Sequence, residues 1–346
     1  MAYVHKGWRK SLYSPHEDPH RVLIEEIGPG YAEYRTEWEQ TTKLELERSY
    51  PVQIDFELNV SCNLKCPMCT WSAEATYGKG KSSWMEFEFF KQIVTDGVTH
   101  GLRAVNLNYI NEPLIRRDLP QFVRCAREAG AVEVMFNTNG LLLTDELTQE
   151  LITAGLTKLS FSVDAFSAET YAKVRVGGEY AKLLKAIHRF LEIRKELGVR
   201  LPLLKLTFLR MADNLHELEP FLDYWEDKAD LFSIQNLHNP FDGAMREEKQ
   251  VHFTTGAPRT PTITPRCPSP FQRVTVRANG SVLPCCNMRA AEHLVMGNAH
   301  TADVKSIWNG EKMQQLRILH QQGRYAENPV CKACIDNSDS WAPEPR

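Results

Sequence analysis

The stretch that decides the fold is a strand-like run followed by three closely spaced cysteines. Val52-Gln-Ile-Asp-Phe-Glu-Leu58 precedes Ser61-Cys-Asn-Leu-Lys-Cys-Pro-Met-Cys-Thr70. Three thiolates at CxxxCxxC spacing can hold three irons of a [4Fe–4S] cube and leave the fourth iron open for chemistry. Structural zinc favours paired elements with four ligands, and no histidine lies near these cysteines. A disulfide framework is typical of small secreted chains. The spacing therefore predicts an iron–sulfur site directly after a strand.

These residues resemble the motif of the radical S-adenosylmethionine (SAM) enzymes. The resemblance implies that Cys62, Cys66 and Cys69 bind the cube, that SAM chelates the open iron, and that Met68 lies beside the adenine. It also implies that an electron from the reduced cube cleaves SAM to a 5′-deoxyadenosyl radical, which abstracts a hydrogen atom from the substrate. The protein then positions the cofactor, supplies electrons and excludes water.

Composition and charge describe an ordinary globular protein. The chain has 346 residues, of which 42% are hydrophobic and 25% charged, with a net charge of −3. This charge gives no support for binding to nucleic acid or to an anionic membrane. No apolar run reaches the roughly 18 to 20 residues of a membrane span, and the first residues contain no apolar signal core. We therefore expect a cytoplasmic protein, in which nine cysteines fit metal ligation in a reducing compartment better than disulfides.

Between residues 51 and 237, strand-like and helical stretches alternate. This alternation predicts an α/β fold with a parallel sheet, right-handed crossovers and helices outside. Six strands are too few for a complete eight-stranded barrel. The resemblance implies a partial (β/α)6 TIM-like barrel that holds SAM and substrate at the C-terminal strand ends. The predicted strands lie near Gln53–Leu58, Ala104–Tyr109, Val132–Phe136, Lys158–Val163, Leu203–Leu209 and Leu231–Leu237. The predicted helices include Glu86–His100, Leu119–Ala129, Asp145–Ala154, Tyr180–Leu197 and Asn214–Asp227.

The pattern divides the chain into four parts. Residues 1–50 form an N-terminal extension with a helix over about Ala32–Arg48, and we expect it to pack on the radical SAM core of residues 51–237. Residues 238–265, rich in proline and glycine, form a linker or covering loop. Residues 266–346 form a small α+β domain, with a hairpin across Ala278-Asn-Gly280 and a helix over about Val304–His320.

The end of the second strand carries a candidate SAM contact. Tyr109-Ile-Asn-Glu-Pro-Leu114 resembles a family motif in which a carboxylate and the neighbouring backbone receive the SAM amino group. The resemblance implies that role for Glu112. Asn111 stands where the family usually has glycine, so the backbone contact there departs from the pattern. Without the upstream cysteines the segment reads as a plain strand-to-helix turn.

Further candidate SAM contacts follow the third and fourth strands. Ser162 and Asp164 resemble polar residues that approach SAM, although period-two alternation alone also puts Ser160 and Ser162 on one face. Arg175 matches an arginine that pairs with the SAM carboxylate, for which a planar guanidinium offers two parallel hydrogen bonds. The alternative for Arg175 is a solvated helix charge. A glycine-rich adenine motif is not recognisable in the fifth strand.

Four later cysteines predict a second metal site. Cys267 precedes the hairpin, Cys285 ends it, and Cys331 and Cys334 form a terminal CxxC. The spacings alone allow zinc almost as readily as iron. The arrangement, with Gly297-Asn298 and Ile307-Trp308-Asn309 between, resembles the shortened "twitch" form of the SPASM extension. That resemblance implies one auxiliary [4Fe–4S] cluster, and so two clusters in all.

Three remaining residues have less certain roles. Cys125 lies on an amphipathic helix and reads as a buried apolar residue. Cys286 adjoins a predicted ligand and is a candidate hydrogen-atom donor facing the active site; the alternative is packing within the hairpin. His238 follows the last strand and is a candidate proton acceptor, although a histidine at the start of a loop is more often solvated.

A cluster with four protein ligands suits electron transfer. We therefore expect hydrogen abstraction from a small, carbohydrate-like or aminocyclitol-like molecule, with net two-electron oxidation and the auxiliary cluster as electron acceptor. Sugar epimerisation, sugar-acid decarboxylation and modification of a ribosomal peptide remain enzymatic alternatives, and an electron carrier or redox sensor is the non-enzymatic one. The expected partners are the substrate and a reductant such as flavodoxin or ferredoxin.

Overall fold

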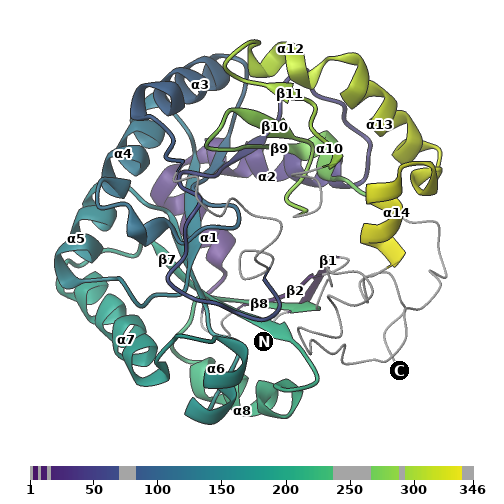
Figure 1. Cartoon of the computed structure of the whole chain (residues 1–346). Coiled ribbons are helices and arrows are strands. Elements are labelled where there is room, and N and C mark those ends of the chain that lie inside the picture. Colours follow the sequence, from purple (N-terminus) through teal and green to yellow (C-terminus); the bar gives the residue numbers. More distant parts are fainter. Residues whose placement is uncertain are drawn as a thin grey trace.

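A computed structural model describes residues 17–69, 83–236, 266–287 and 293–336, together with the backbone of residues 3–6 and 9–13. Its strands form a single sheet in the order β1-β2-β8-β7-β6-β5-β4-β3-β9-β10-β11. Helices surround the central strands on one side (Figure 1). Within these ranges, no helix is both long enough and apolar enough to cross a membrane.

Six neighbouring parallel strands form the barrel, and they follow one another in chain order. They are β3 (Gln53–Phe56), β4 (Ala104–Asn106), β5 (Glu133–Thr138), β6 (Lys158–Ser162), β7 (Leu203–Arg210) and β8 (Leu231–Asn236). The crossovers carry α3 (Phe87–Thr99), α4 (Leu119–Ala129), α5 (Asp145–Thr153), α6 (Ala168–Val174), α7 (Tyr180–Glu196) and α8 (Leu218–Trp225). The predicted partial (β/α)6 barrel is confirmed. Helix α6 is an element that the sequence analysis did not single out.

The barrel strands have an apolar outer face and a polar inner face. Leu159 and Phe161 of β6 belong to the main hydrophobic core, as do alternate residues of β7. Because side chains alternate across a strand, the intervening Ser160 of β6 and Thr207 of β7 point to the other face. Their hydroxyl oxygens lie 3.1 Å apart there. The helices therefore bury one face of the sheet and leave a hydrogen-bonding surface on the other.

The C-terminal hairpin extends the barrel sheet beyond β3. Strand β9 (Arg273–Val276) pairs with β3 in parallel, and β10 (Ser281–Leu283) and β11 (Gly297–Asn298) continue the sheet in antiparallel order. The hairpin predicted from Ala278-Asn-Gly280 is confirmed, with Val282 opposite Val276. The domain expected to follow the barrel therefore shares its sheet.

The N-terminal helix prediction was wrong in its bounds. The predicted helix over about Ala32–Arg48 is replaced by α1 (Pro19–Ile27) and α2 (Pro29–Thr42). Gly28 lies between them at a φ of 97°, a conformation that glycine adopts at little cost. Each helix begins at a proline, which suits the first helical position. Strand β1 (Tyr3–Lys6) pairs with β2 (Arg9–Tyr13) in antiparallel order, and β2 pairs with β8.

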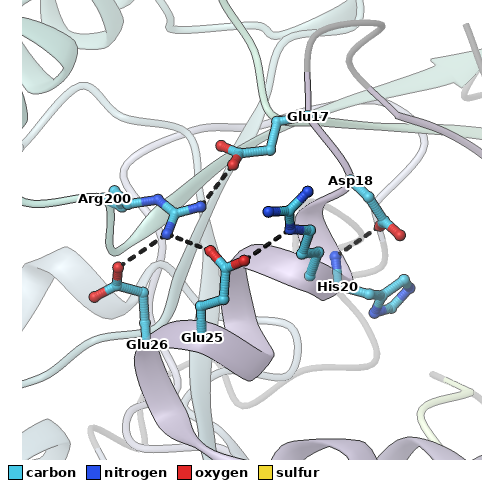
Figure 2. Close-up of polar contacts among 7 residues, drawn as sticks. Glu17, Asp18, His20, Glu25, Glu26 and Arg200 are labelled. Carbon is cyan, nitrogen blue, oxygen red and sulfur yellow. Dashed lines mark hydrogen bonds and ion pairs between the residues drawn. The ribbon is translucent and has the colours of Figure 1, made fainter.

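The two N-terminal helices close the barrel at the N-terminal ends of its strands. Tyr31 and Tyr34 are fully buried against the first residues of several strands: Val52, Ala104, Leu203 and Leu231. Figure 2 shows Arg200, just before β7, among Glu17, Glu25 and Glu26 of this region; its guanidinium nitrogens lie 2.7, 2.8 and 3.2 Å from their carboxylate oxygens. Because all four side chains are partly exposed, apolar burial contributes more to this closure than the ion pairs do.

The single helix predicted over about Val304–His320 is two helices, α12 (Val304–Trp308) and α13 (Glu311–Gln321). Asn309 and Gly310 interrupt it, since Gly310 has an extended conformation and caps α13. The Asn309 side chain donates to the carbonyl oxygens of Lys305, at 2.7 Å, and Ser49, at 3.0 Å. The interruption lets α12 dock on the segment that leads into β3, next to α3 (Figure 1).

Trp308 holds the C-terminal domain against the barrel. Its indole is fully buried, donates to the Arg48 carbonyl oxygen at 2.7 Å, and lies under the Arg317 guanidinium, 4.1 Å from the ring centre. We expect Trp308→Ala to lower the free energy of unfolding by about 3–5 kcal/mol because it leaves a large cavity. Ile318→Ala on α13 is the control: Ile318 is 46% exposed, and its loss should change stability by no more than about 0.5 kcal/mol. If chemical denaturation gave equal losses of unfolding free energy for Trp308→Ala and Ile318→Ala, this role of Trp308 would be contradicted.

Candidate active site

The cysteine motif occupies the loop that follows β3. Cys66 is buried and Cys62 and Cys69 are half-buried, all as free thiols. The Cys69 N–H donates to the Cys66 carbonyl oxygen at 3.1 Å, and the Lys65 N–H donates to the carbonyl oxygen of Val176 at 2.8 Å. Burial raises the pKa of Cys62 to about 12, and Glu112, Cys66 and Cys69 add to the rise. The three cysteines therefore share one poorly solvated place with Glu112.

Glu112 lies in the segment that follows β4, just before a short turn at Pro113–Ile115, and is 2% exposed. Its Oε1 accepts from the Leu114 N–H at 3.0 Å and the Thr138 hydroxyl at 2.6 Å, and its Oε2 accepts from the Asn139 N–H at 2.8 Å. A carboxylate has about four acceptor positions, so Oε2 retains room for one more donor. Burial raises the pKa of Glu112, while these three donors stabilise its charged form. This geometry is compatible with the ammonium contact predicted from the sequence.

A network of asparagines joins the cysteine loop to the strand ends. The Asn111 side chain donates to Asn59 Oδ1 at 2.6 Å, and Asn59 donates to the Ser61 hydroxyl at 2.8 Å. The Asn139 amide donates to Asn63 Oδ1, inside the motif, at 2.8 Å. Asn111, where the family usually has glycine, is thus a structural amide. The sequence analysis missed Asn59 and Asn63.

Arg175 is half-buried and its first partner is Asp164. Its guanidinium forms an ion pair with the Asp164 carboxylate and lies 3.8 Å from Cys66 Sγ. Burial works against this charge, but Asp164 and Cys66 outweigh it and raise the pKa of Arg175. The reading of Arg175 as a solvated helix charge was therefore wrong. Its pairing with a SAM carboxylate stays a prediction, with Asp164 as the partner that the structure assigns.

Asp164 stands two residues after the half-buried Ser162 of β6 and is fully buried. Its φ of 59° is unusual for a residue other than glycine. Its Oδ1 accepts from the Leu209 N–H at 2.7 Å, and its carbonyl oxygen accepts from Asn214 at 2.9 Å. These bonds hold the carboxylate toward Arg175. The predicted SAM contacts of Asp164 and Ser162 stay predictions.

Unsatisfied buried atoms around Cys66 fit a site built for a further polar group. Arg175 Nε and the Tyr171 hydroxyl are buried without a hydrogen-bond partner in the described part of the chain. Burial raises the pKa of Tyr171 to about 12, and Cys66, Asp164 and Glu112 are among its charged neighbours. Buried polar atoms rarely stay unpaired. Together with Met68, which is 6% exposed in the core, these residues would hold an iron–sulfur cluster and its SAM.

The C-terminal cysteines converge although they are distant in sequence. Cys267 precedes α10 (Ser269–Gln272), Cys285 follows β10, and Cys331 and Cys334 lie on α14 (Pro329–Asp336). Burial raises the pKa of Cys285 well above its usual value, and Cys267 and Cys334 contribute to the rise. Burial and Cys267 likewise raise the pKa of Cys331 to about 12. Four thiols in one poorly solvated place form the donor set of an S4 site.

Cys286 lies with this group. Its charge adds to the pKa rises of Cys267, Cys285 and Cys334, which burial dominates. Its predicted role as a hydrogen-atom donor stays untested. Cys125 packs against the main core from α4, but it is half-buried and not buried as predicted. His238 lies outside the described residues. In the described part, no three His, Cys, Asp or Glu side chains are grouped to hold a single metal ion.

Two family models match the chain in the regions that carry these cysteines. The Radical SAM superfamily matches residues 56–212, and SPASM, an iron–sulfur cluster-binding domain, matches residues 267–335. The chain belongs to the radical SAM superfamily. Its C-terminal match adds an auxiliary cluster domain, so SAM and two [4Fe–4S] clusters are the cofactors of this radical SAM enzyme.

Curated relatives of this radical SAM protein match its core. A probable GTP 3′,8-cyclase from Methanococcus maripaludis is 31% identical over 172 residues, which cover 49% of this chain and 54% of that protein. An AdoMet-dependent heme synthase from Methanosarcina barkeri is 32% identical over 138 residues, covering 40% of this chain and 38% of the relative. The alignments with the cyclases thus span only about half of each relative.

Solved structures share the fold over most of the chain. BtrN in complex with AdoMet and 2-DOIA covers 83% of this chain and 93% of its own, with a TM-score of 0.51 and 17% identity. SuiB from Streptococcus suis bound to S-adenosylmethionine covers 88% of this chain and 76% of its own, with a TM-score of 0.61 and 14% identity. At these identities the likeness concerns the fold.

The ligand assignment predicts the metal content of variants. Wild-type protein reconstituted without oxygen should hold about eight irons per chain, and the Cys62/Cys66/Cys69→Ala variant about four. The variant should also lose all reductive cleavage of SAM, because no open iron remains. Cys125→Ala should match the wild type in iron, sulfide and 5′-deoxyadenosine. Iron content unchanged by the triple substitution would refute the assignment.

Glu112→Gln tests the SAM contact. We expect the dissociation constant for SAM to rise at least about tenfold, equivalent to about 1.4 kcal/mol, because the amide lacks the carboxylate's charge. The variant should retain both iron–sulfur clusters, as measured by its iron content. The variant should also lose about 1–3 kcal/mol of stability. The reason is that the NH2 group of the new amide would face donors from which the carboxylate now accepts hydrogen bonds.

Glu217→Gln is a matched control. Glu217 is also buried and accepts bonds from the Ser167 N–H, at 3.1 Å, and the Thr170 hydroxyl, at 2.7 Å, at the start of α6. The Glu217→Gln variant should lose a similar amount of stability and keep the wild-type affinity for SAM. Equal SAM affinities of the two variants would remove Glu112 from the SAM site.

Proposed function

We propose that this radical SAM enzyme abstracts hydrogen from a small, hydroxyl-rich molecule, such as a sugar or an aminocyclitol, and oxidises it by two electrons. The observation that carries the proposal is the polar inner face of the barrel. An apolar substrate would find few partners there, whereas hydroxyl and amide groups match a substrate that carries several hydrogen-bonding groups.

The central strands supply these groups in register. Ser160 pairs with Lys205 across β6 and β7, and Ser162 pairs with Thr207. Asn106 of β4 donates to the Asn108 carbonyl oxygen at 2.9 Å, while its own Oδ1 is buried without a partner among the described residues. An unpaired buried acceptor costs free energy, which a donor on a bound substrate would recover.

The proposed division of labour follows the two cysteine groups. The SAM-binding cluster, once reduced, supplies the radical that abstracts the hydrogen atom. In this scheme Glu112 and Arg175 orient SAM through charged hydrogen bonds, and Asp164 positions Arg175. Cys267, Cys285, Cys331 and Cys334 hold the auxiliary cluster, which suits the second electron of an oxidation because all four of its ligands come from the protein. Cys286 and His238 remain the candidates for hydrogen and proton transfer.

Fold similarity to BtrN, whose structure holds 2-DOIA together with AdoMet, supports a small substrate. We place the enzyme in the cytoplasm, where a flavodoxin-like or ferredoxin-like protein would supply electrons. The domain division into an extension, a core to residue 237, a linker over 238–265 and an auxiliary domain from 266 is part of the proposal.

Peptide modification is the second candidate. It is favoured by the fold likeness to SuiB bound to the precursor peptide SuiA, which covers 83% of this chain with a TM-score of 0.58. Sugar epimerisation and sugar-acid decarboxylation would use the same inner face, and they differ in the fate of the substrate radical. An electron carrier or redox sensor would not require Glu112 and Arg175 beside the open iron.

Mass spectrometry of metabolite extracts separates these candidates. Extract incubated with reduced enzyme and SAM should yield a product that has lost two hydrogen atoms, in equal amount to 5′-deoxyadenosine. An isomer of unchanged mass indicates epimerisation, and loss of carbon dioxide indicates decarboxylation. A change confined to a peptide would overturn the small-molecule proposal in favour of peptide modification.

Asn106→Leu tests the inner face. We expect the substrate KM to rise about tenfold or more, because the buried acceptor is replaced by an apolar group. SAM cleavage in the absence of substrate should be unchanged, since Asn106 is assigned in this proposal to the substrate and not to SAM. An unchanged KM for the substrate identified by mass spectrometry would place binding elsewhere.

A further inference from the structure

Tyr109, at the end of β4, connects the barrel to the auxiliary-cluster domain. Its hydroxyl donates to the carbonyl oxygen of Asn287 at 2.7 Å, across 178 positions in the sequence. Its backbone N–H donates to Asn111 Oδ1 at 2.9 Å, which fixes the start of the segment that carries Glu112. One side chain thus joins the strand end of the predicted SAM site to the loop after Cys286.

Asn287 contacts two of the predicted auxiliary ligands. Its backbone N–H donates to the Cys285 sulfur, and its side-chain amide donates to the Cys334 sulfur. Cys285 belongs to the hairpin and Cys334 to α14, so Asn287 reaches both halves of the ligand set. Both bonds stabilise negative charge on sulfur.

Apolar packing runs beside this polar link. Ile110 and Leu283 form a small buried cluster, against which Cys69, Tyr109 and Val295 pack. This apolar cluster contacts Cys69, a predicted ligand of the SAM-binding cube, and includes Leu283 of the hairpin that leads to Cys285. Tyr109 is therefore held at both ends, and the position of Asn287 is determined by the barrel.

We propose that Asn287 sets the reduction potential of the auxiliary cluster, and that Tyr109 is the positioning residue that holds Asn287 in place. Hydrogen bonds to the sulfurs of an iron–sulfur cluster stabilise its more negative, reduced form and so raise its potential. Residues behind the ligands also fix ligand orientation. A raised potential makes the auxiliary cluster a better electron acceptor. The inference rests on the proposed ligands of that cluster.

The test measures the midpoint potential of the auxiliary cluster in the full-length, reconstituted protein by redox titration followed by electron paramagnetic resonance. The Cys62/Cys66/Cys69→Ala variant identifies the auxiliary signal, because it should hold only that cluster. Asn287→Leu should shift the midpoint to a more negative value, since Cys334 loses its amide donor. Tyr109→Phe should give a smaller shift in the same direction.

Tyr224→Phe is the matched control. The Tyr224 hydroxyl also has one side-chain partner, His188 Nε2 at 3.0 Å, but it lies on α8, and its loss should leave the midpoint unchanged. An unchanged midpoint in Asn287→Leu, with wild-type iron and sulfide content, would overturn the inference and leave the ligand assignment intact. Wild-type protein with about four irons and no second signal would instead overturn both.

Discussion

The parallel alignment of the six barrel strands is the constraint on which the site depends. Because β3, β4, β5 and β6 run in the same direction, the loops that follow them meet at one edge of the sheet. The cysteine loop, Glu112, Asn139 and Asp164 come from four successive strand ends. The bonds from Asn139 to both Glu112 and Asn63 show how closely these ends approach. A sheet with mixed directions would separate them.

Burial at these strand ends destabilises charged side chains that lack partners. Glu112 and Asp164 are buried and Arg175 is half-buried, and charges withdrawn from water are stable only when paired and hydrogen-bonded. The fold meets this need with backbone N–H groups, a threonine hydroxyl and the Asp164–Arg175 ion pair. The Arg175 Nε and the Tyr171 hydroxyl still lack a hydrogen-bond partner in the described part of the chain. A bound cofactor would supply hydrogen-bond partners for these two atoms.

A continuous sheet also explains how the second cysteine group comes to lie near the first. Strand β9 pairs with both β3 and β10, so only β9 separates the strand that leads to the first cysteine loop from the strand that leads to Cys285. The contacts of Tyr109 and Ile110 then join the two regions directly. The auxiliary domain is in this sense an extension of the barrel sheet, and Trp308 closes it against the N-terminal side.

The sequence by itself determined the fold class, the six barrel strands and the hairpin, because these follow from local signals, and its resemblance to a known family indicated the cofactors. Alternating strand and helix patterns, an Asn-Gly turn and the CxxxCxxC spacing each lie within a short window. Only the tertiary structure decided the partner of Arg175, the amide role of Asn111, and the link from Tyr109 to Asn287. These contacts join residues 11, 52 and 178 positions apart. Side-chain pairing across such distances depends on how the strands and loops pack, which no local pattern contains.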